Sequence, residues 1–408
     1  MNATIRSFLA SLRPGQRVFF QGGTGECLLL YHALRDEPGL ARGVEFWSCL
    51  IPGLNRHDYG SLPGQVRLVT FMASPALEPS ILSGQTQLRA APYSAIADLL
   101  AGMAFDHVLL HTAPPDAHDR CSFGVACDTP GLVWRRARRR TAFINTAMPS
   151  IPGADWLPRD QIDCAIEISE PLIAPSGVQP ASGGVLEAIA KASAELIPDD
   201  CTLQSGIGDA PGAIVSALRF HRNISVCSGI ITPDYQSIAE AGAINMSARN
   251  SAGIAWGDGA FHDWLRTSGF ELTSIARTHD RAVLASFPRF VSIGSAIEVD
   301  LGGNLNLEWR LSRRISSVGG ALDYMAAAAV SPNGLSIIAL PASSAGSSRI
   351  VPHIASPTIP GALADVIVTE NGVARLKGLS QRQRAEALIA IAGAEHQGFL
   401  SRAAESIQ

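Results

Sequence analysis

The stretch "LQSGIGDAPGAIVSAL" at residues 203–218 joins an apolar strand end to an apolar helix through a Gly-x-Gly loop. The segment "FFQGGTGECLLLYHAL" at 19–34 has the same layout: a strand end, a glutamine, a Gly-x-Gly pair and a helix that ends in Ala-Leu. Gly23 and Gly206 occupy equivalent places, 183 positions apart. A repeat of this kind predicts a duplicated strand–loop–helix unit.

A second pair of matching positions supports the duplication. Asp116 and Asp300 are 184 positions apart, which is nearly the same offset. Short runs of β-branched residues alternate with stretches of helical spacing through the second half, as is typical of a mostly parallel sheet. We therefore predict the α/β class, with two similar open α/β domains of the same type.

The two halves are joined by a stretch that has the composition of a linker. Residues 170–184, "EPLIAPSGVQPASGG", are rich in Pro, Ser and Gly and show no periodicity. We place the boundary near residue 180, which gives an N-terminal domain over 1–180 and a C-terminal domain over 181–408.

The composition of the chain indicates which kinds of ligand or partner the protein is expected to bind. The formal net charge of −4 gives no basic field for nucleic acid or an anionic membrane, and no run approaches 18 apolar residues. The seven cysteines are odd in number and form no C-x-x-C pair, which argues against a disulfide framework or a metal site. We expect a cytoplasmic protein that acts on a small molecule and has no metal, nucleic-acid or membrane partner.

The glycine loop in the second half is the main candidate for a ligand site. Gly206 and Gly208 let the backbone approach a ligand closely, and Pro211 suits the first turn of the following helix, whose free N–H groups can hold an anion. The alternative is an ordinary tight turn. The stretch "SVGGALDY" at 317–324 adds a second glycine pair, which either meets a ligand or only allows close packing of a helix.

Three further features have less specific explanations. Cys227 reads as a small buried side chain rather than a nucleophile, because no basic residue lies beside it in the sequence. The arginines of 134–141, "WRRARRRT", read as a solvated face rather than a phosphate site. Glu298 lies in an apolar run, so it either faces a cleft at a strand end or is paired.

Seven ordered motifs resemble the acetyl-CoA hydrolase/transferase family, which includes the 4-hydroxybutyrate CoA-transferases, over nearly the whole chain. They are "APPDAHDRCSFGVACD" (113–128), "LQSGIGDAPGAI" (203–214), "AEAGAIN" (239–245), "VSIGSAIEVDLGGNLNLE" (291–308), "ISSVGGALDY" (315–324), "SIIALPASSAGSSRIVP" (336–352) and "DVIVTENGVARLKGLSQRQRAEALI" (365–389).

The resemblance implies the CoA-transferase fold, with coenzyme A as substrate or product bound mainly by the second domain. We also expect a homodimer. The implied CoA-binding residues are Gly206, Ile207, Gly208, Asp209, Ala210, Ile297, Gly319 and Gly320.

The resemblance also implies a glutamate nucleophile, which this sequence lacks. In the family that glutamate forms an acyl anhydride and then a glutamyl-CoA thioester. Its place, 23 residues after the first loop glycine, is taken here by Gly229, and the match at Gly242 supports the register. The usual lysine of a later motif is likewise Ala345. We expect the loss of the carboxylate to widen the pocket.

Three functions are compatible with these observations. The first, which we favour, is an acyl-CoA-processing enzyme that cleaves a thioester or C–C bond with water, using Glu298 or Glu370 as the candidate catalytic base. The second is an acyl-CoA:carboxylate CoA-transferase that uses another carboxylate, such as Asp234. The third is a non-catalytic CoA-binding protein. For Glu298 and Glu370 the alternative is a structural role in pairing.

Overall fold

The computed structural model describes residues 3–175 and 183–405, which form two compact units. The boundary predicted near residue 180 lies outside the described residues. Within them, the first unit comprises 3–175, 251–278 and 314–319, and the second comprises 183–250, 279–313 and 320–405.

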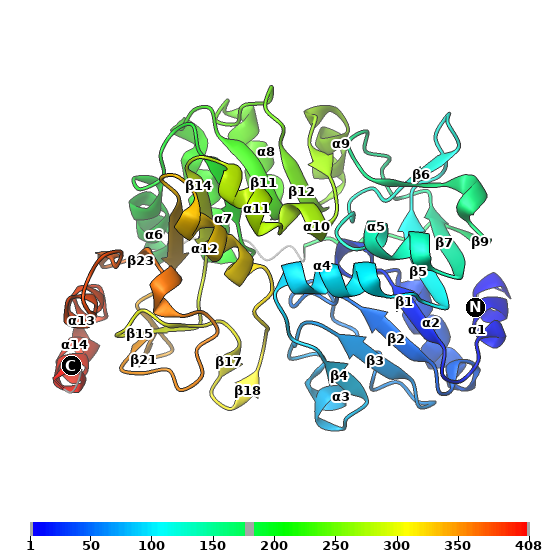
Figure 1. Cartoon of the computed structure of the whole chain (residues 1–408), viewed down its shortest axis with the longest axis horizontal. Coiled ribbons are helices and arrows are strands. Elements are labelled where there is room, and N and C mark those ends of the chain that lie inside the picture. The colour runs from blue at the N-terminus through cyan, green and yellow to red at the C-terminus, as the bar shows by residue number, and fades with distance from the viewer. Residues whose placement is uncertain (1–2, 176–182, 406–408) are drawn as a thin grey trace. The chain divides into compact units, whose positions relative to one another are not determined.

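The first unit is built on a seven-stranded parallel sheet with the order β4-β3-β2-β1-β5-β7-β9 (Figure 1). Strand β1 therefore lies between β2 and β5. In sheet order the strands are Thr86–Leu88, Arg67–Thr70, Glu45–Ser48, Arg17–Phe20, His107–Thr112, Arg139–Asn145 and Cys164–Ile168.

Helices and two small strand pairs complete the first unit. Strands β6 and β8 pair in antiparallel fashion, and β12 and β13 pair in parallel. The elements are α1 (Ala3–Ser11), α2 (Leu28–Asp36), α3 (Glu78–Leu82), α4 (Tyr93–Gly102), β6 (Arg120–Ser122), α5 (Pro130–Val133), β8 (Trp156–Pro158), β12 (Ser251–Ala255), α9 (Gly259–Ser268), β13 (Glu271–Leu272) and α10 (Ile275–Thr278).

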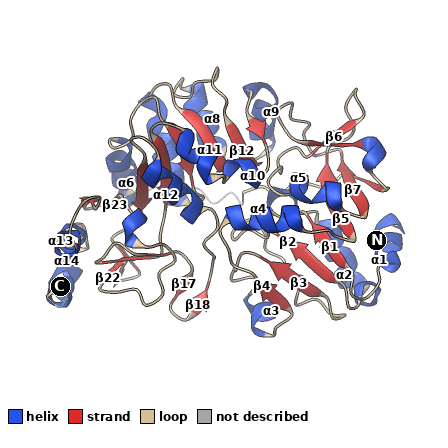
Figure 2. Ribbon diagram, viewed as in Figure 1, coloured by secondary structure: helices blue, strands red, loops and turns tan. Residues whose placement is uncertain are grey.

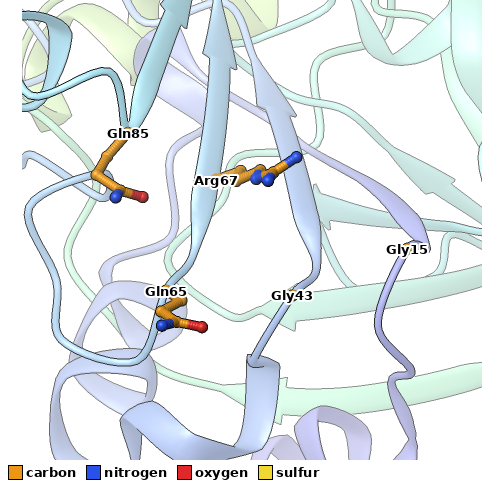
Figure 3. Close-up of a pocket in the computed structure, with 5 residues that line it drawn as sticks. All are labelled: Gly15, Gly43, Gln65, Arg67 and Gln85. Carbon is orange, nitrogen blue, oxygen red and sulfur yellow. The ribbon is translucent and has the colours of Figure 1, made fainter.

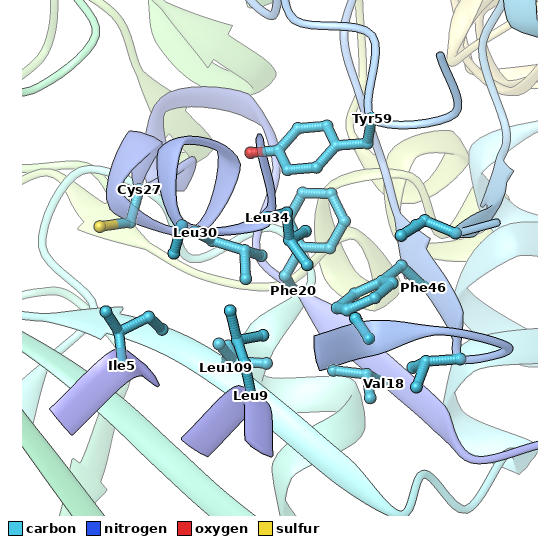
Figure 4. Close-up of a cluster of buried hydrophobic side chains, with 14 of the residues drawn as sticks. Ile5, Leu9, Val18, Phe20, Cys27, Leu30, Leu34, Phe46, Tyr59 and Leu109 are labelled. Carbon is cyan, nitrogen blue, oxygen red and sulfur yellow. The ribbon is translucent and has the colours of Figure 1, made fainter. Parts of the chain in front are cut away.

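The core of the first unit explains why its first two helices form. Helix α1 places apolar side chains at the helical spacing of Ile5, Phe8 and Leu9, and all three are buried. They join Leu30 and Leu34 of α2 in one cluster with side chains of β1, β2 and β5 (Figure 4). Burial of apolar area at about 25 cal/mol per Å² is the main force that holds these helices on the sheet.

The second unit contains the strand order β11-β10-β14-β19-β23-β24 (Figure 1). Neighbouring strands in this run are parallel except β23 and β24, which are antiparallel. The strands are β10 (Thr202–Ser205), β11 (Ser225–Ile231), β14 (Phe290–Gly294), β19 (Leu335–Ala339), β23 (Val366–Thr369) and β24 (Gly372–Arg375).

Helices and short strand pairs surround this sheet (Figure 2). Helices α6, α7 and α8 pack in succession, α11 packs on α12, and α12 packs on β14 and β19. A small sheet has the order β16-β15-β22. The bounds are α6 (Gly184–Ala194), α7 (Asp209–Ala217), α8 (Pro233–Glu240), α11 (Arg281–Ser286), β15 (Glu298–Asp300), β16 (Leu305–Asn306), β17 (Trp309–Arg310), α12 (Ala321–Val330), β20 (Ser343–Ser344), β21 (Ser347–Ser348), β22 (Ile350–Val351), α13 (Gln381–Ala390) and α14 (Ala394–Ala404).

The predicted α/β class is confirmed, and both sheets have the same topological switch point. In the first sheet β1 lies between β2 and β5, and in the second β10 lies between β11 and β14. In each case the chain leaves the central strand for one neighbour and later returns to the other side. The carboxyl ends of the strands at such a switch point form the usual ligand-binding crevice of open α/β sheets.

Asp116 and Asp300, which the sequence repeat places 184 positions apart, make matching hydrogen bonds. Each backbone N–H donates to the carbonyl four residues later, Arg120 in one case and Asn304 in the other. Each Oδ1 accepts from the backbone N–H groups two and four residues later, at 2.9 to 3.0 Å. Arg120 and Asn304 also donate to the Oδ2 of their own aspartate, at 2.8 and 3.0 Å. The two halves therefore share a turn as well as a sheet order.

Candidate functional site

The glycine loop of the second unit lies at the carboxyl end of β10, at the switch point. Its first residue, Gly206, donates its N–H to the carbonyl of Ile293 on β14 at 2.8 Å. Gly208 has a φ of 128°, which an L side chain adopts only with strain, and helix α7 begins at the next residue. Ile207, Gly208 and Asp209 are exposed, so the loop is open to a ligand.

The equivalent loop of the first unit is closed. Gly23, Thr24 and Gly25 are buried. The side chain of Asn55 holds this loop: its Oδ1 accepts from Gly23 N at 3.1 Å, and its Nδ2 donates to Gly23 O at 2.9 Å and to Glu26 Oε2 at 2.8 Å. The loop is therefore present in both halves, but it is accessible to a ligand only in the second half, where the sequence predicts the CoA contacts.

Gly229 lies in β11 and has no room for a side chain. A Cβ atom built on it would lie 2.8 Å from Tyr324 Oη and 2.9 Å from His279 Cε1. Contacts of this length force a displacement in a packed interior. The expectation of a wider pocket is therefore wrong, because two aromatic side chains occupy the space that any side chain at position 229 would need.

The two side chains beside Gly229 are buried and uncharged. Burial lowers the pKa of His279 to about 3, so its imidazole is neutral at physiological pH. Burial also raises the pKa of Tyr324 well above its usual 10. The two ring centroids are 4.7 Å apart. Neither side chain therefore supplies an anionic group beside Gly229 at physiological pH.

Gly320 is required by the same packing. A Cβ there would lie 2.5 Å from His279 Nε2, although the backbone φ of −85° is open to any residue. Its neighbour Gly319 has a φ of 54°, and its carbonyl accepts from Tyr93 N at 3.2 Å in the first unit. The predicted glycine pair is thus divided between the two units, and close packing accounts for Gly320 without a ligand.

Cys227 lies two residues before Gly229 and is part of the core. It is 2% exposed and packs in a cluster with Leu284, Phe290 and Tyr324. This agrees with its interpretation as a small buried side chain. None of the seven cysteines forms a disulfide bond.

The candidate bases Glu298 and Glu370 lie at different places along the carboxyl edge. Glu298 begins β15, four residues after β14 ends, and its Oε2 accepts from Asn306 Nδ2 at 3.0 Å. Glu370 follows β23, and its Oε2 accepts from Ala342 N at 2.8 Å. Because β23 is four strands from β11, Glu370 lies roughly 19 Å along the sheet from the Gly229 strand.

Two other predicted residues also have defined partners. Ile297 donates its N–H to Asn306 O at 2.8 Å and accepts at its carbonyl from Arg349 Nη1 at 2.9 Å. Asp234, in the first turn of α8, accepts from Ser216 Oγ at 2.8 Å and from Thr232 Oγ1 at 2.9 Å. Both carboxylate oxygens of Asp234 are thus tied to hydroxyl groups, which hold it against α7.

A separate pocket of about 540 Å³ lies at the amino ends of the strands of the first sheet, lined by Gly15, Gly43, Gln65, Arg67 and Gln85 (Figure 3). Strands β2 and β3 begin at Glu45 and Arg67, so this pocket is at the opposite edge from the glycine loops. It contains none of the predicted site residues.

Residues 3–175 and 183–405 contain neither a cluster of metal-ligating side chains nor a membrane-spanning helix. No group of three or more His, Cys, Asp or Glu side chains there is arranged to hold a metal ion. Among the helices formed by these residues, none has the length and apolar character needed to cross a bilayer.

The parallel sheets and the glycine loop at the switch point define an α/β protein of the open-sheet type, and comparison with known proteins gives its family. Residues 257–404 match the acetyl-CoA hydrolase/transferase C-terminal domain. The chain is 29% identical to a 4-hydroxybutyrate coenzyme A transferase of Clostridium kluyveri, over 95% of this chain and 94% of that protein. It is 31% identical to a butyryl-CoA:acetate CoA-transferase of Anaerostipes caccae, over 74% and 73%.

The solved structure of RipA from Yersinia pestis superimposes with a TM-score of 0.90 at 25% identity, covering 99% of this chain and 97% of that one. The chain therefore belongs to the acetyl-CoA hydrolase/transferase family.

Sequence reasoning did not identify the packing of His279 and Tyr324 against Gly229. His279 follows a short helix and Tyr324 lies in an alanine-rich one, so neither stands in a pattern that signals chemistry. The only available signal was the "SVGGALDY" motif, which contains Gly320 and Tyr324 and was assigned to ligand binding or helix packing.

Proposed function

We propose that this protein binds an acyl-CoA at the loop of Gly206 to Ala210 and processes it without a covalent glutamyl intermediate. The observation that carries the proposal is the packing of Tyr324 and His279 against Gly229, where the family resemblance locates the nucleophile. The exposure of the loop at the switch point supports its role in binding CoA. The proposal includes a cytoplasmic location, which the seven free thiols support, and a homodimer.

The reaction that fits these groups best is hydrolysis. A carboxylate takes a proton from water, the resulting hydroxide attacks the thioester carbonyl, the C–S bond breaks, and the proton passes to the CoA thiolate. Glu298 is the better base of the two candidates, because it follows the strand next to the glycine loop, whereas Glu370 is three strands from β10, or roughly 14 Å. Asn306 holds one oxygen of Glu298 and so orients the other.

Two experiments test this function. Calorimetry with CoA compares the wild type with Gly206→Trp, because a side chain at Gly206 meets only ordinary contacts and so blocks the loop without backbone strain. Gly184→Trp, at an open position at the start of α6, is the matched control. Loss of binding in the first variant alone is expected. Equal binding by both variants would place the CoA site elsewhere.

Thiol release from acyl-CoA thioesters then tests catalysis. Glu298→Gln is expected to lower the rate about 100-fold or more, as for a lost general base, and Glu370→Gln to change it little. The second candidate function is CoA binding without catalysis, which the filled position beside Gly229 also favours. A wild type that binds CoA but releases no thiol would select that function.

A further inference from the structure

The pocket at the amino ends of the first sheet spans the entries of four neighbouring strands (Figure 3). Gly15, Gly43 and Gln65 lie two residues before β1, β2 and β3 begin, and Gln85 lies one residue before β4. The volume of about 540 Å³ is within the range of small-molecule sites, which is roughly 300–1,000 Å³. The pocket is therefore large enough for a small organic molecule.

Two glycine turns form one side of this pocket. The φ of Gly15 is 84° and that of Gly43 is 74°, in the left-handed region that favours glycine. Gly15 donates its N–H to Gly43 O at 2.8 Å, which joins the two turns. A Cβ atom built on Gly15 would meet no other described part of the chain within 4 Å. The backbone on this side is thus both fixed and open.

Gln65 adopts a left-handed conformation although it is not a glycine. Its φ is 60°, which is uncommon for a side chain of this type. Gln65 is exposed, so burial does not account for the choice of residue. Its Oε1 accepts from Arg42 Nε at 3.3 Å, which leaves the Nε2 group as a donor. A strained residue that packing does not explain points to a use for its side chain.

Arg67 contributes a positive charge to the pocket. It is the first residue of β3 and is exposed. Among the residues that the structure describes, none accepts a hydrogen bond from its guanidinium or forms an ion pair with it. Glu45, its register partner on β2, instead accepts from Trp47 Nε1 at 2.6 Å. The N–H donors of Arg67 are therefore available to an anion.

We propose that this pocket is a second ligand site, which binds a small organic anion through Arg67. The guanidinium pairs with a phosphate or carboxylate group, and the amides of Gln65 and Gln85 bind polar groups on the rest of the ligand. None of the described residues that line the pocket is acidic. The site belongs to the first unit, whereas the Gly206 loop belongs to the second, so the inference goes beyond the proposed function and does not depend on it.

The test is calorimetric titration of the full chain with inorganic phosphate, glucose 6-phosphate, succinate and glucose. We expect the wild type to bind at least one of the three anions, and Arg67→Gln to bind that anion at least about fivefold more weakly. Arg402→Gln is the matched control, because Arg402 in α14 is also exposed and has no partner among the described residues. It should bind the anion as the wild type does.

The pattern of binding identifies the anionic group. Binding of the two phosphates without succinate assigns a phosphate ligand, and binding of succinate without the phosphates assigns a carboxylate ligand. Binding of all three assigns an anion site that accepts either group. Glucose bound as tightly as glucose 6-phosphate would overturn the inference, because the charge would then contribute nothing.

Gln65→Gly tests the second contact without strain. The substitution removes the side-chain amide and relieves the left-handed side chain, so it should weaken binding of the anion without lowering the melting temperature. Unchanged binding with a lower melting temperature would show a structural role and overturn the part assigned to Gln65.

The CoA affinity separates this inference from the proposed function. Arg67→Gln should bind CoA as the wild type does, and a loss of CoA binding in this variant would overturn the assignment of a second site. A wild type that binds none of the three anions, or equal anion affinities in Arg67→Gln and Arg402→Gln, would overturn it as well. A wild type without affinity for CoA would contradict the proposed function alone.

Discussion

Tyr324 Oη lies 2.8 Å from the point that a Cβ atom on Gly229 would occupy. A buried phenol and a buried neutral imidazole fill this space, so the glycine at position 229 is a packing requirement. A glutamate introduced at this position would therefore require the surrounding side chains to repack.

We predict that Gly229→Ala destabilises the protein by about 1–3 kcal/mol, the usual range for overpacking a core. Urea unfolding measures the change. The double variant Gly229→Ala/Tyr324→Phe, which removes the closest atom, should be less destabilised than the sum of its single variants. Gly184→Ala, at an open position, is the control. Additive effects of the two substitutions would contradict the contact.

The ion pair between Arg281 and Asp323 holds the segment after His279 against α12. Arg281 Nε donates to Asp323 Oδ1 at 2.9 Å, and the Asp323 side chain is 0% exposed. Arg281→Met leaves a buried carboxylate and should lower the free energy of unfolding by about 3 kcal/mol. The exposed pair of Arg382 with Glu386 is the comparison, and Arg382→Met should cost less than about 1 kcal/mol. Equal losses of unfolding free energy in Arg281→Met and Arg382→Met would contradict a stabilising role for the buried pair.

His279 should make the folded state sensitive to acid. Its pKa is about 3 in the folded protein and about 6.5 in an unfolded chain, so the unfolded state binds more protons between these values. Stability therefore falls as the pH falls from 6.5 toward 3. His279→Gln should reduce this slope by up to about 1.4 kcal/mol per pH unit. The exposed His118→Gln is the control, and the same slope in both variants would argue against a buried neutral His279.

Asp128 should make the folded state less stable as the pH rises, the opposite of the effect of His279. Burial raises the pKa of this carboxyl to about 7, with hydrogen bonds from Thr129 opposing the shift. The folded state then holds more protons than the unfolded state between about pH 4 and 7, so stability falls as the pH rises through that window. Asp128→Asn should remove this loss of stability and raise the melting temperature at pH 8. Asp98 is exposed, so Asp98→Asn should leave the melting temperature unchanged. Equal changes in the two variants would contradict a raised pKa of Asp128.

The features that the sequence predicted correctly are those encoded locally. The loop of Gly206 and Gly208 is visible because its backbone geometry demands glycine over a few residues. The matching positions of Asp116 and Asp300 can be found in the sequence because each aspartate takes part in four hydrogen bonds within five consecutive residues.

The features that the sequence did not predict depend on tertiary packing. The absence of a side chain at Gly229 is plain, but its consequence depends on His279 and Tyr324, which are 50 and 95 residues farther along the chain. No local pattern indicates which distant side chain fills a space.

The central claim is tested most directly by mass spectrometry after incubation with acyl-CoA and borohydride, which reduces a glutamyl-CoA thioester. A covalent step requires a carboxylate within roughly 3–3.5 Å of the thioester carbon, and Gly229 has none. We predict that peptides spanning 223–235 keep their unmodified mass while free CoA is released or bound. A reduced or CoA-modified acid in this segment, such as Asp234, together with ping-pong transfer kinetics, would contradict the account.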